Sequence, residues 1–162
     1  MKILIFTEGT ALKPSSEQSN VTHLFRTYIP NGEIVKKLID WEKQSAEISY
    51  LTSRTSPEEI DDIRFVLEKY NFPQVQNLLY RKEGQEYKDV AEALIPDIFI
   101  EDDCASIGGQ WQMTYPHIRS EIKSEIHSIV VKEFASIDYL PDNLQELQGF
   151  TSFPQPSSSQ SH

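Results

Sequence analysis

The chain has 162 residues, with 15 Lys and Arg against 25 Asp and Glu, which gives a formal net charge of −10. This length predicts one domain with its own core, because chains divide into separate cores only beyond about 250 residues. The acidic balance disfavours nucleic acid as a partner, since phosphate binding needs clustered Lys and Arg. One cysteine excludes an internal disulfide and fits a reducing compartment. No apolar run approaches the ~20 residues of a membrane span, so we expect a cytoplasmic monomer or homodimer without a membrane partner.

The first third of the chain predicts a strand, a long loop, a helix and a second strand. Residues 2–6 form a continuous apolar run, which is typical of a strand buried on both faces. Residues 11–30 are rich in Pro and Ser without a clear period, which predicts a loop with at most one helical turn. Apolar residues at helical spacing then predict a helix from Asn31 to about Ser45, before a short strand at 48–51.

The next helix has a well-defined predicted start. Ser56 can accept a hydrogen bond from a free backbone amide, Pro57 has no amide to leave unpaired, and Glu59 completes a capping box. Asn71 and Pro73 end this helix. Beyond it, the pattern predicts in chain order a strand at 75–80, a helix through Tyr87 and Leu94, a strand at 98–100, helical structure within 118–126 and a strand at 128–134.

Strands that alternate with helices indicate a parallel α/β sheet, in which ligands bind outside the carboxyl ends of the strands. We expect this domain to span residues 1–149. Residues 150–162 are rich in Ser, Gln and Pro without charged side chains, which predicts a disordered tail.

Polar side chains follow three of the predicted strands. The first is followed by Thr7 to Thr10, the second by Thr52-Ser53-Arg54 and the fourth by Glu101-Asp102-Asp103, while Lys88 opens the helix before the fourth strand. Carboxylate oxygens suit Mg²⁺, and hydroxyls, amides and an ammonium group suit phosphate oxygens. The sequence therefore predicts a site for a divalent cation and a phosphate at one edge of the sheet.

The order of these residues resembles that of the haloacid dehalogenase (HAD) superfamily over roughly residues 1–135. Gly9-Thr10 resembles the end of the family's hhhhDxDGT segment, Thr52 its second motif, Lys88 its third, and Glu101-Asp102 or Asp102-Asp103 its acidic fourth motif. The resemblance implies a three-layer Rossmann-like parallel sheet with strand order 5-4-1-2-3. The short segment between the first two strands implies a minimal cap or none.

The resemblance also implies roles for individual residues. Thr52, Ser53 and Lys88 would bind the phosphate of a phosphorylated small molecule, with Lys82 as a rival to Lys88 for the motif lysine. Glu101 and Asp102 would hold a Mg²⁺ ion. A solvated turn is an equally good interpretation of the acidic run, because three adjacent carboxylates repel one another unless a cation or solvent screens them.

One departure from the family pattern bears on activity. Alignment on Gly9-Thr10 puts Phe6 where the family has its nucleophilic aspartate and Glu8 where it has its acid/base aspartate. A benzyl group can neither attack phosphorus nor bind a cation, and the loss of a nucleophile commonly costs on the order of a million-fold in turnover. Glu8 remains the candidate catalytic residue, since it differs from aspartate by one methylene.

Two further features have simpler interpretations. Cys104 is expected to be a small buried residue, since no histidine lies at a recognisable spacing from it. Trp111, Met113 and Tyr115 can line a pocket mouth or an oligomer contact, but the simpler expectation is that they cover the edge of the core.

The sequence leaves three functions open. The first is a HAD-like protein whose phosphohydrolase chemistry is lost or weak and which still binds a divalent cation or a phosphorylated small molecule. The second is an active Mg²⁺-dependent phosphatase that uses Glu8 and Asp102. The third is a non-catalytic structural or interaction protein.

Overall fold

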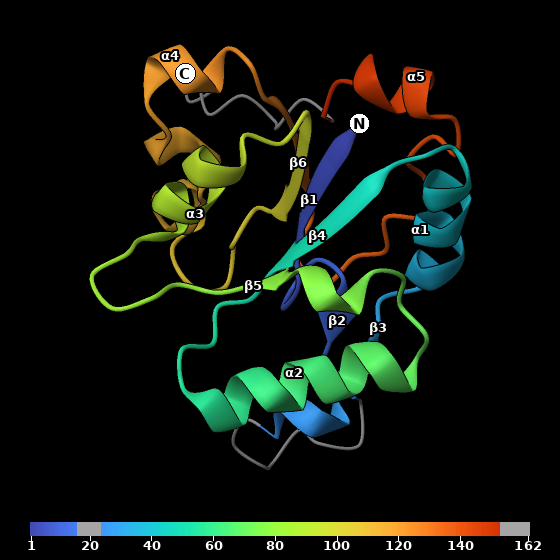
Figure 1. Ribbon diagram of the computed structural model, residues 1–162, viewed down its shortest axis with the longest axis vertical. Helices are drawn as coiled ribbons and strands as arrows, with labels where there is room; N and C mark the ends of the chain where they lie inside the picture. The colour runs from blue at the N-terminus through green and yellow to red at the C-terminus, as the bar shows by residue number, and fades with distance from the viewer. Residues whose placement is uncertain (16–23, 153–162) are drawn as a thin grey trace, which may run out of the picture.

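A five-stranded parallel sheet forms the centre of the protein in a computed structural model that describes residues 1–15 and 24–152 (Figure 1). The strand order is β5-β4-β1-β6-β7, so β1 lies between β4 and β6. The strands of this sheet are β1 (Lys2–Phe6), β4 (Glu47–Leu51), β5 (Leu78–Leu79), β6 (Ile98–Asp102) and β7 (His127–Val131). The expected alternation of strands and helices in a parallel sheet is confirmed, and the first and fourth predicted strands are neighbours.

Helices cover both faces of this sheet. Helix α1 (Ile34–Lys43) and the short α5 (Leu144–Gln148) lie on one face, and α3 (Tyr87–Leu94) and α4 (Ser120–Lys123) lie on the other (Figure 1). Helix α2 (Pro57–Lys69) lies beyond the carboxyl ends of the strands. The sequence did not predict α5.

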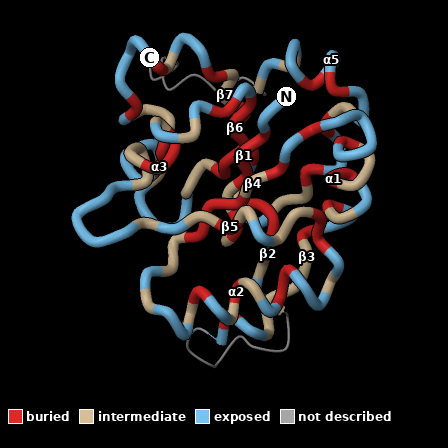
Figure 2. Tube along the Cα trace, in the orientation of Figure 1, coloured by how far each residue is buried: buried red, intermediate tan, exposed pale blue. Residues whose placement is uncertain are grey.

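The buried residues follow the strands and the inner sides of the helices (Figure 2). Because successive strand residues point to opposite faces, β1 contributes Ile3 and Ile5 to the core beneath α1 and Leu4 to the core beneath α3. Tyr50 and Trp41 fill the first core, and Phe99 belongs to the second. Two packed layers of helices therefore hold β1 in the middle of the sheet.

The segment expected to be a long loop contains short regular elements. Strands β2 (Leu12–Lys13) and β3 (Ile29–Pro30) form an antiparallel pair, and residues Phe25–Thr27 form a 3₁₀ turn against α2. Residues 16–23 of the predicted loop lie outside the described part of the chain. The strand numbering differs from the expected order 5-4-1-2-3 because β2 and β3 intervene in the chain and form this separate pair.

The predicted strand at 75–80 is shorter than expected. Residues Val75–Asn77 form a 3₁₀ turn, and β5 contains Leu78 and Leu79 alone. The reason is that two side chains replace backbone partners of β4. The side-chain oxygen of Gln74 accepts from Ile48 N at 3.0 Å, and the side-chain nitrogen of Asn77 donates to Ile48 O at 3.0 Å.

The helix predicted within 118–126 is reduced to α4. A 3₁₀ turn at Tyr115–His117 precedes it, and another 3₁₀ turn lies at Gly109–Gln112. By contrast, α2 starts where its capping signals predict, with the Ser56 hydroxyl accepting from Glu59 N at 3.3 Å. The Glu59 carboxylate accepts from the Ser56 hydroxyl rather than from the Ser56 backbone.

The first residues of the predicted tail contact the sheet. Ser152 Oγ accepts from Val130 N at 2.8 Å, and Phe150 packs against the core beneath α1. The rest of the predicted tail, residues 153–162, lies outside the described residues. Within the described ranges, no helix has the length and apolar character needed to cross a bilayer.

Candidate functional site

The carboxyl ends of β1 and β6 meet around Gly9. Its φ of +94° favours glycine, and a Cβ atom added there would lie 2.8 Å from Asp102 Oδ1. The next residue, Thr10, is buried and donates its hydroxyl hydrogen bond to the same oxygen at 2.8 Å. Gly9-Thr10 therefore joins the end of the first strand to the acidic residues of the fourth, as the sequence order implies.

Asp102 is a buried carboxyl group with a like charge nearby. It accepts hydrogen bonds from Thr10 Oγ1 and from Cys104 N, the latter at 3.1 Å. Burial raises the pKa of Asp102 above its ordinary value; the two hydrogen bonds oppose this shift, and the charge of Glu133 adds to it. A cation beside Asp102 would relieve both unfavourable contributions.

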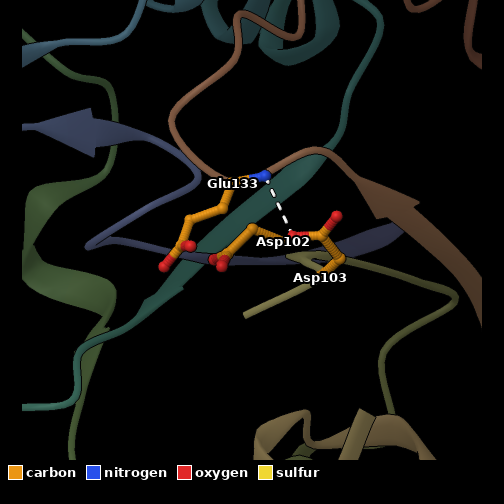
Figure 3. Close-up of side chains that lie close together, drawn as sticks. All are labelled: Asp102, Asp103 and Glu133. Atoms are coloured by element: carbon orange, nitrogen blue, oxygen red, sulfur yellow. Dashed lines mark hydrogen bonds between the residues drawn. The ribbon is translucent and has the colours of Figure 1, made fainter. Parts of the chain in front are cut away.

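Asp102, Asp103 and Glu133 form an acidic cluster with one oxygen from each residue within 4.8 Å of the others. Figure 3 shows the carboxyl groups of Asp102 and Glu133 side by side, while Asp103 turns back to accept from Glu133 N at 3.2 Å. Glu133 also accepts from the backbone and hydroxyl of Ser106, each at 2.8 Å. The sequence analysis missed Glu133 because it extended the fifth strand to Phe134, whereas β7 ends at Val131.

Glu101 does not join this cluster. It precedes Asp102 on β6, so its side chain points to the opposite face of the sheet. There the carboxylate accepts from Thr114 N at 2.7 Å and Tyr115 N at 2.9 Å. Burial raises the pKa of Glu101 to about 7, although these hydrogen bonds oppose the shift. The structure thus separates Glu101 from Asp102, against the paired role that the family resemblance implied, and ties Glu101 to the loop after β6.

Glu8, Thr52 and Ser53 come together at the ends of β1 and β4. The Glu8 carboxylate accepts from the Thr52 hydroxyl and from Ser53 N and Oγ, at 2.8 and 2.9 Å for the two Ser53 donors. The predicted phosphate donors therefore already bind an anion that belongs to the chain itself. Arg54 contacts Ser53 Oγ at 2.8 Å and pairs with Glu59 at 3.5 Å.

Phe6 ends β1 next to this group. Its ring packs edge-to-face on Tyr87, with 5.4 Å between the ring centroids, and it borders the core beneath α3. Tyr87 is the first residue of α3. The Arg81 guanidinium lies over the Tyr87 ring, 4.1 Å from the ring centroid. The last residue of β1 is therefore part of a packed group formed with Tyr87 and Arg81.

A cavity of about 310 Å³ opens beside Tyr87. Lys88 and Arg81 both line it, as do Trp111 and His117 from the loop after β6. Lys82, the alternative to Lys88, is exposed and does not line it. Sequence reasoning missed Arg81, although this residue follows the third strand at the same edge of the sheet.

Met113 and Trp111, both in the loop after β6, do not have the same environment. Met113 is buried, but Trp111 is 81% exposed, so the expectation that Trp111 covers the core is wrong. Cys104 is half-buried, and burial together with the Asp102 charge raises the pKa of its thiol to about 12. A thiol with that pKa is not a nucleophile near neutral pH.

The donor set beside Asp102 fits a hard divalent cation in kind. Its ligand atoms are carboxylate oxygens, which Mg²⁺ prefers, and water can complete the coordination. The acidic cluster lies at the carboxyl ends of β6 and β7. Among the described residues, the carboxyl groups that lie close enough to one another to hold such an ion are those of Asp102, Asp103 and Glu133.

Comparison with known proteins agrees with this architecture. No family model matches the chain, and no curated protein matches it significantly. Among solved structures, the chain is similar to the class C acid phosphatase from Bacillus anthracis with tungstate bound, with a TM-score of 0.58 and 14% sequence identity. The match covers 98% of this chain and 74% of that chain. At this identity the likeness concerns the fold alone: the present chain shares the α/β architecture of that phosphatase.

Proposed function

We propose that this chain is a HAD-like protein that has lost covalent phosphatase chemistry and binds a divalent cation beside Asp102. The observation that carries the proposal is Phe6 at the end of β1, with its ring packed on Tyr87. An aspartyl-phosphate route needs a carboxylate at that position, and no other group of the described site replaces it there.

The rival proposal, an active phosphatase that uses Glu8 and Asp102, has less support. Three hydrogen-bond donors hold the Glu8 carboxylate and engage both of its oxygens, so neither oxygen is free to contact a substrate. Thr52 and Ser53 are also engaged by Glu8, so we assign phosphate binding to Lys88 and not to these two residues.

Hydrolysis of p-nitrophenyl phosphate with Mg²⁺ tests the proposal. We expect the wild-type rate to equal that of the Asp102→Asn variant and to lie at background, because the loss of a nucleophile costs on the order of a million-fold. Turnover at ordinary enzyme rates that disappears in both Glu8→Gln and Asp102→Asn would establish the rival mechanism.

A further inference from the structure

The cavity beside Tyr87 combines positive charge with exposed aromatic surface. Arg81, Lys88 and Trp111 all line it. The carboxylate of Glu86 also lines the cavity but is exposed to solvent. The composition suits an anionic group attached to a flat apolar body.

The cations of this cavity retain hydrogen-bonding capacity. Arg81 Nε is buried without a hydrogen-bond partner among the described residues, while one of its terminal nitrogens donates to Ser53 O at 3.3 Å. Lys88 Nζ lies 3.7 Å from Asp89 Oδ1, beyond hydrogen-bond distance. By contrast, the donors of Thr52 and Ser53 are satisfied by Glu8. Lys88 is ion-paired with Asp89 but makes no hydrogen bond to it, and Arg81 Nε has no partner, so both cations keep donors for an anion.

Hydrogen bonds hold the backbone of the loop that carries the exposed indole of Trp111. The Trp111 backbone carbonyl accepts a hydrogen bond from His117 Nε2 at 2.9 Å. Further along the same loop, the Glu101 carboxylate accepts from the backbone amides of Thr114 and Tyr115. The 81% exposure of Trp111 is the largest among the exposed large apolar residues of the described chain. An exposed indole on this anchored backbone offers stacking surface to a planar ring.

We propose that this cavity binds a phosphomonoester that carries a planar ring, with the phosphate on Lys88 and Arg81 and the ring on Trp111. The proposal rests on the proposed function, since it names the class of phosphorylated ligand that the site takes. The phosphate is then bound by Arg81 and Lys88 instead of Thr52 and Ser53. Trp111 selects ligands that carry a planar ring.

Calorimetric titration of the full chain with phenyl phosphate, in EDTA without added metal, tests this proposal. We expect binding in the millimolar range or tighter, with inorganic phosphate and benzoate each at least about tenfold weaker, because each lacks one half of the recognised group. The intrinsic fluorescence of the protein should change on binding, since Trp111 faces the cavity while Trp41 is buried beneath α1.

Four variants locate the site. Lys88→Gln should weaken phenyl phosphate about tenfold and Trp111→Ala about fivefold, whereas Lys82→Gln and Ser53→Ala should change its affinity by less than about twofold. Lys82→Gln is the matched control for loss of one positive charge near the same loop. Circular dichroism spectra that match the wild type will show that each variant is folded.

Several results would overturn the proposal: no binding of phenyl phosphate, equal binding of benzoate, equal losses in Lys82→Gln and Lys88→Gln, or a loss in Ser53→Ala alone. Failure of the proposed function would look different. Metal-dependent turnover by the wild type would contradict that function and leave the metal-free binding result intact.

Discussion

The ends of β1 and β6 lie next to each other and have opposite chemistry. At the end of β1, Phe6 packs its ring on Tyr87 and the following carboxylate, Glu8, is bound by Thr52 and Ser53. At the end of β6, the buried Asp102 keeps a second carboxylate, Glu133, beside it. Under the proposed function, the end of β1 has no group for a covalent step, while the end of β6 has carboxylates that suit a cation.

The end of β6 contains a second contrast, between Glu101 and Asp102. Glu101 bonds two backbone amides on one face of the sheet, and Asp102 faces the acidic cluster on the other. We infer that Glu101 is structural and that Asp102 is the functional member of the pair.

The largest expected effect comes from removal of Glu101. Glu101→Ala leaves the amides of Thr114 and Tyr115 without their partner and should lower the free energy of unfolding by about 2–5 kcal/mol. Urea denaturation monitored by circular dichroism measures this change. Asp103→Ala, which removes a less buried carboxylate two residues further on, is the control and should cost less than about 1 kcal/mol. Equal costs would contradict the structural role of Glu101.

The second effect is a dependence of stability on pH. The pKa of Glu101 is raised to about 7 in the folded protein, so this group binds more protons folded than unfolded between its ordinary value and pH 7. The free energy of unfolding should therefore fall as pH rises through that window, by up to about 3 kcal/mol. Urea denaturation at pH 5.5 and pH 8 tests the sign. Glu101→Gln should flatten the profile, and an unchanged slope in that variant would assign the effect elsewhere.

The third effect tests the contact between the two strand ends. Gly9→Ala forces a left-handed φ on alanine and pushes its methyl group against Asp102. We expect a loss of about 2–3 kcal/mol in the free energy of unfolding. Gly84→Ala is the matched control, because Gly84 also has a positive φ but a Cβ there meets no atom within 4 Å. If both variants lose the same amount, backbone strain alone explains the effect, and the close approach to Asp102 contributes nothing.

The smallest effect concerns the cation. A ligand that binds the folded state alone raises stability, so Mg²⁺ at about ten times its dissociation constant should add about 1.4 kcal/mol. Differential scanning fluorimetry with MgCl₂ measures the shift in melting temperature, with NaCl of equal ionic strength as the control. The shift should disappear in Asp102→Asn. A wild-type protein that does not respond would favour the structural or interaction role over the proposed function.

Local signals in the sequence were sufficient for most of the sheet and for α2 and α3. Ser56 and Pro57 define the start of α2, and the apolar run at residues 2–6 corresponds to the central strand. The strand predicted at 75–80 was too long, and no local sequence pattern shows the reason. Side chains of Gln74 and Asn77 hydrogen-bond to β4, and this pairing depends on residues about 30 positions away.

The site was predictable in its location and less so in its members. Strand-end placement correctly indicated that Asp102 lies near Gly9-Thr10, and that Thr52 and Ser53 lie near Glu8. It could not show that the Glu8 carboxylate binds those donors, because the direction of a side chain in a loop cannot be derived from the amino-acid sequence. Glu133 was missed because the predicted fifth strand ran to Phe134, whereas Arg81 directly follows the predicted third strand and its place at the same sheet edge was not used.

Trapping of a phosphoryl-enzyme tests the central claim most directly. The protein is incubated with ³²P-labelled acetyl phosphate and Mg²⁺, denatured in acid and treated with hydroxylamine, which releases phosphate from an acyl phosphate. We expect no hydroxylamine-sensitive label on the wild-type chain, since Phe6 offers no carboxylate to phosphorylate. Stoichiometric label on an Asp or Glu side chain would show that covalent phosphatase chemistry survives and would contradict the account.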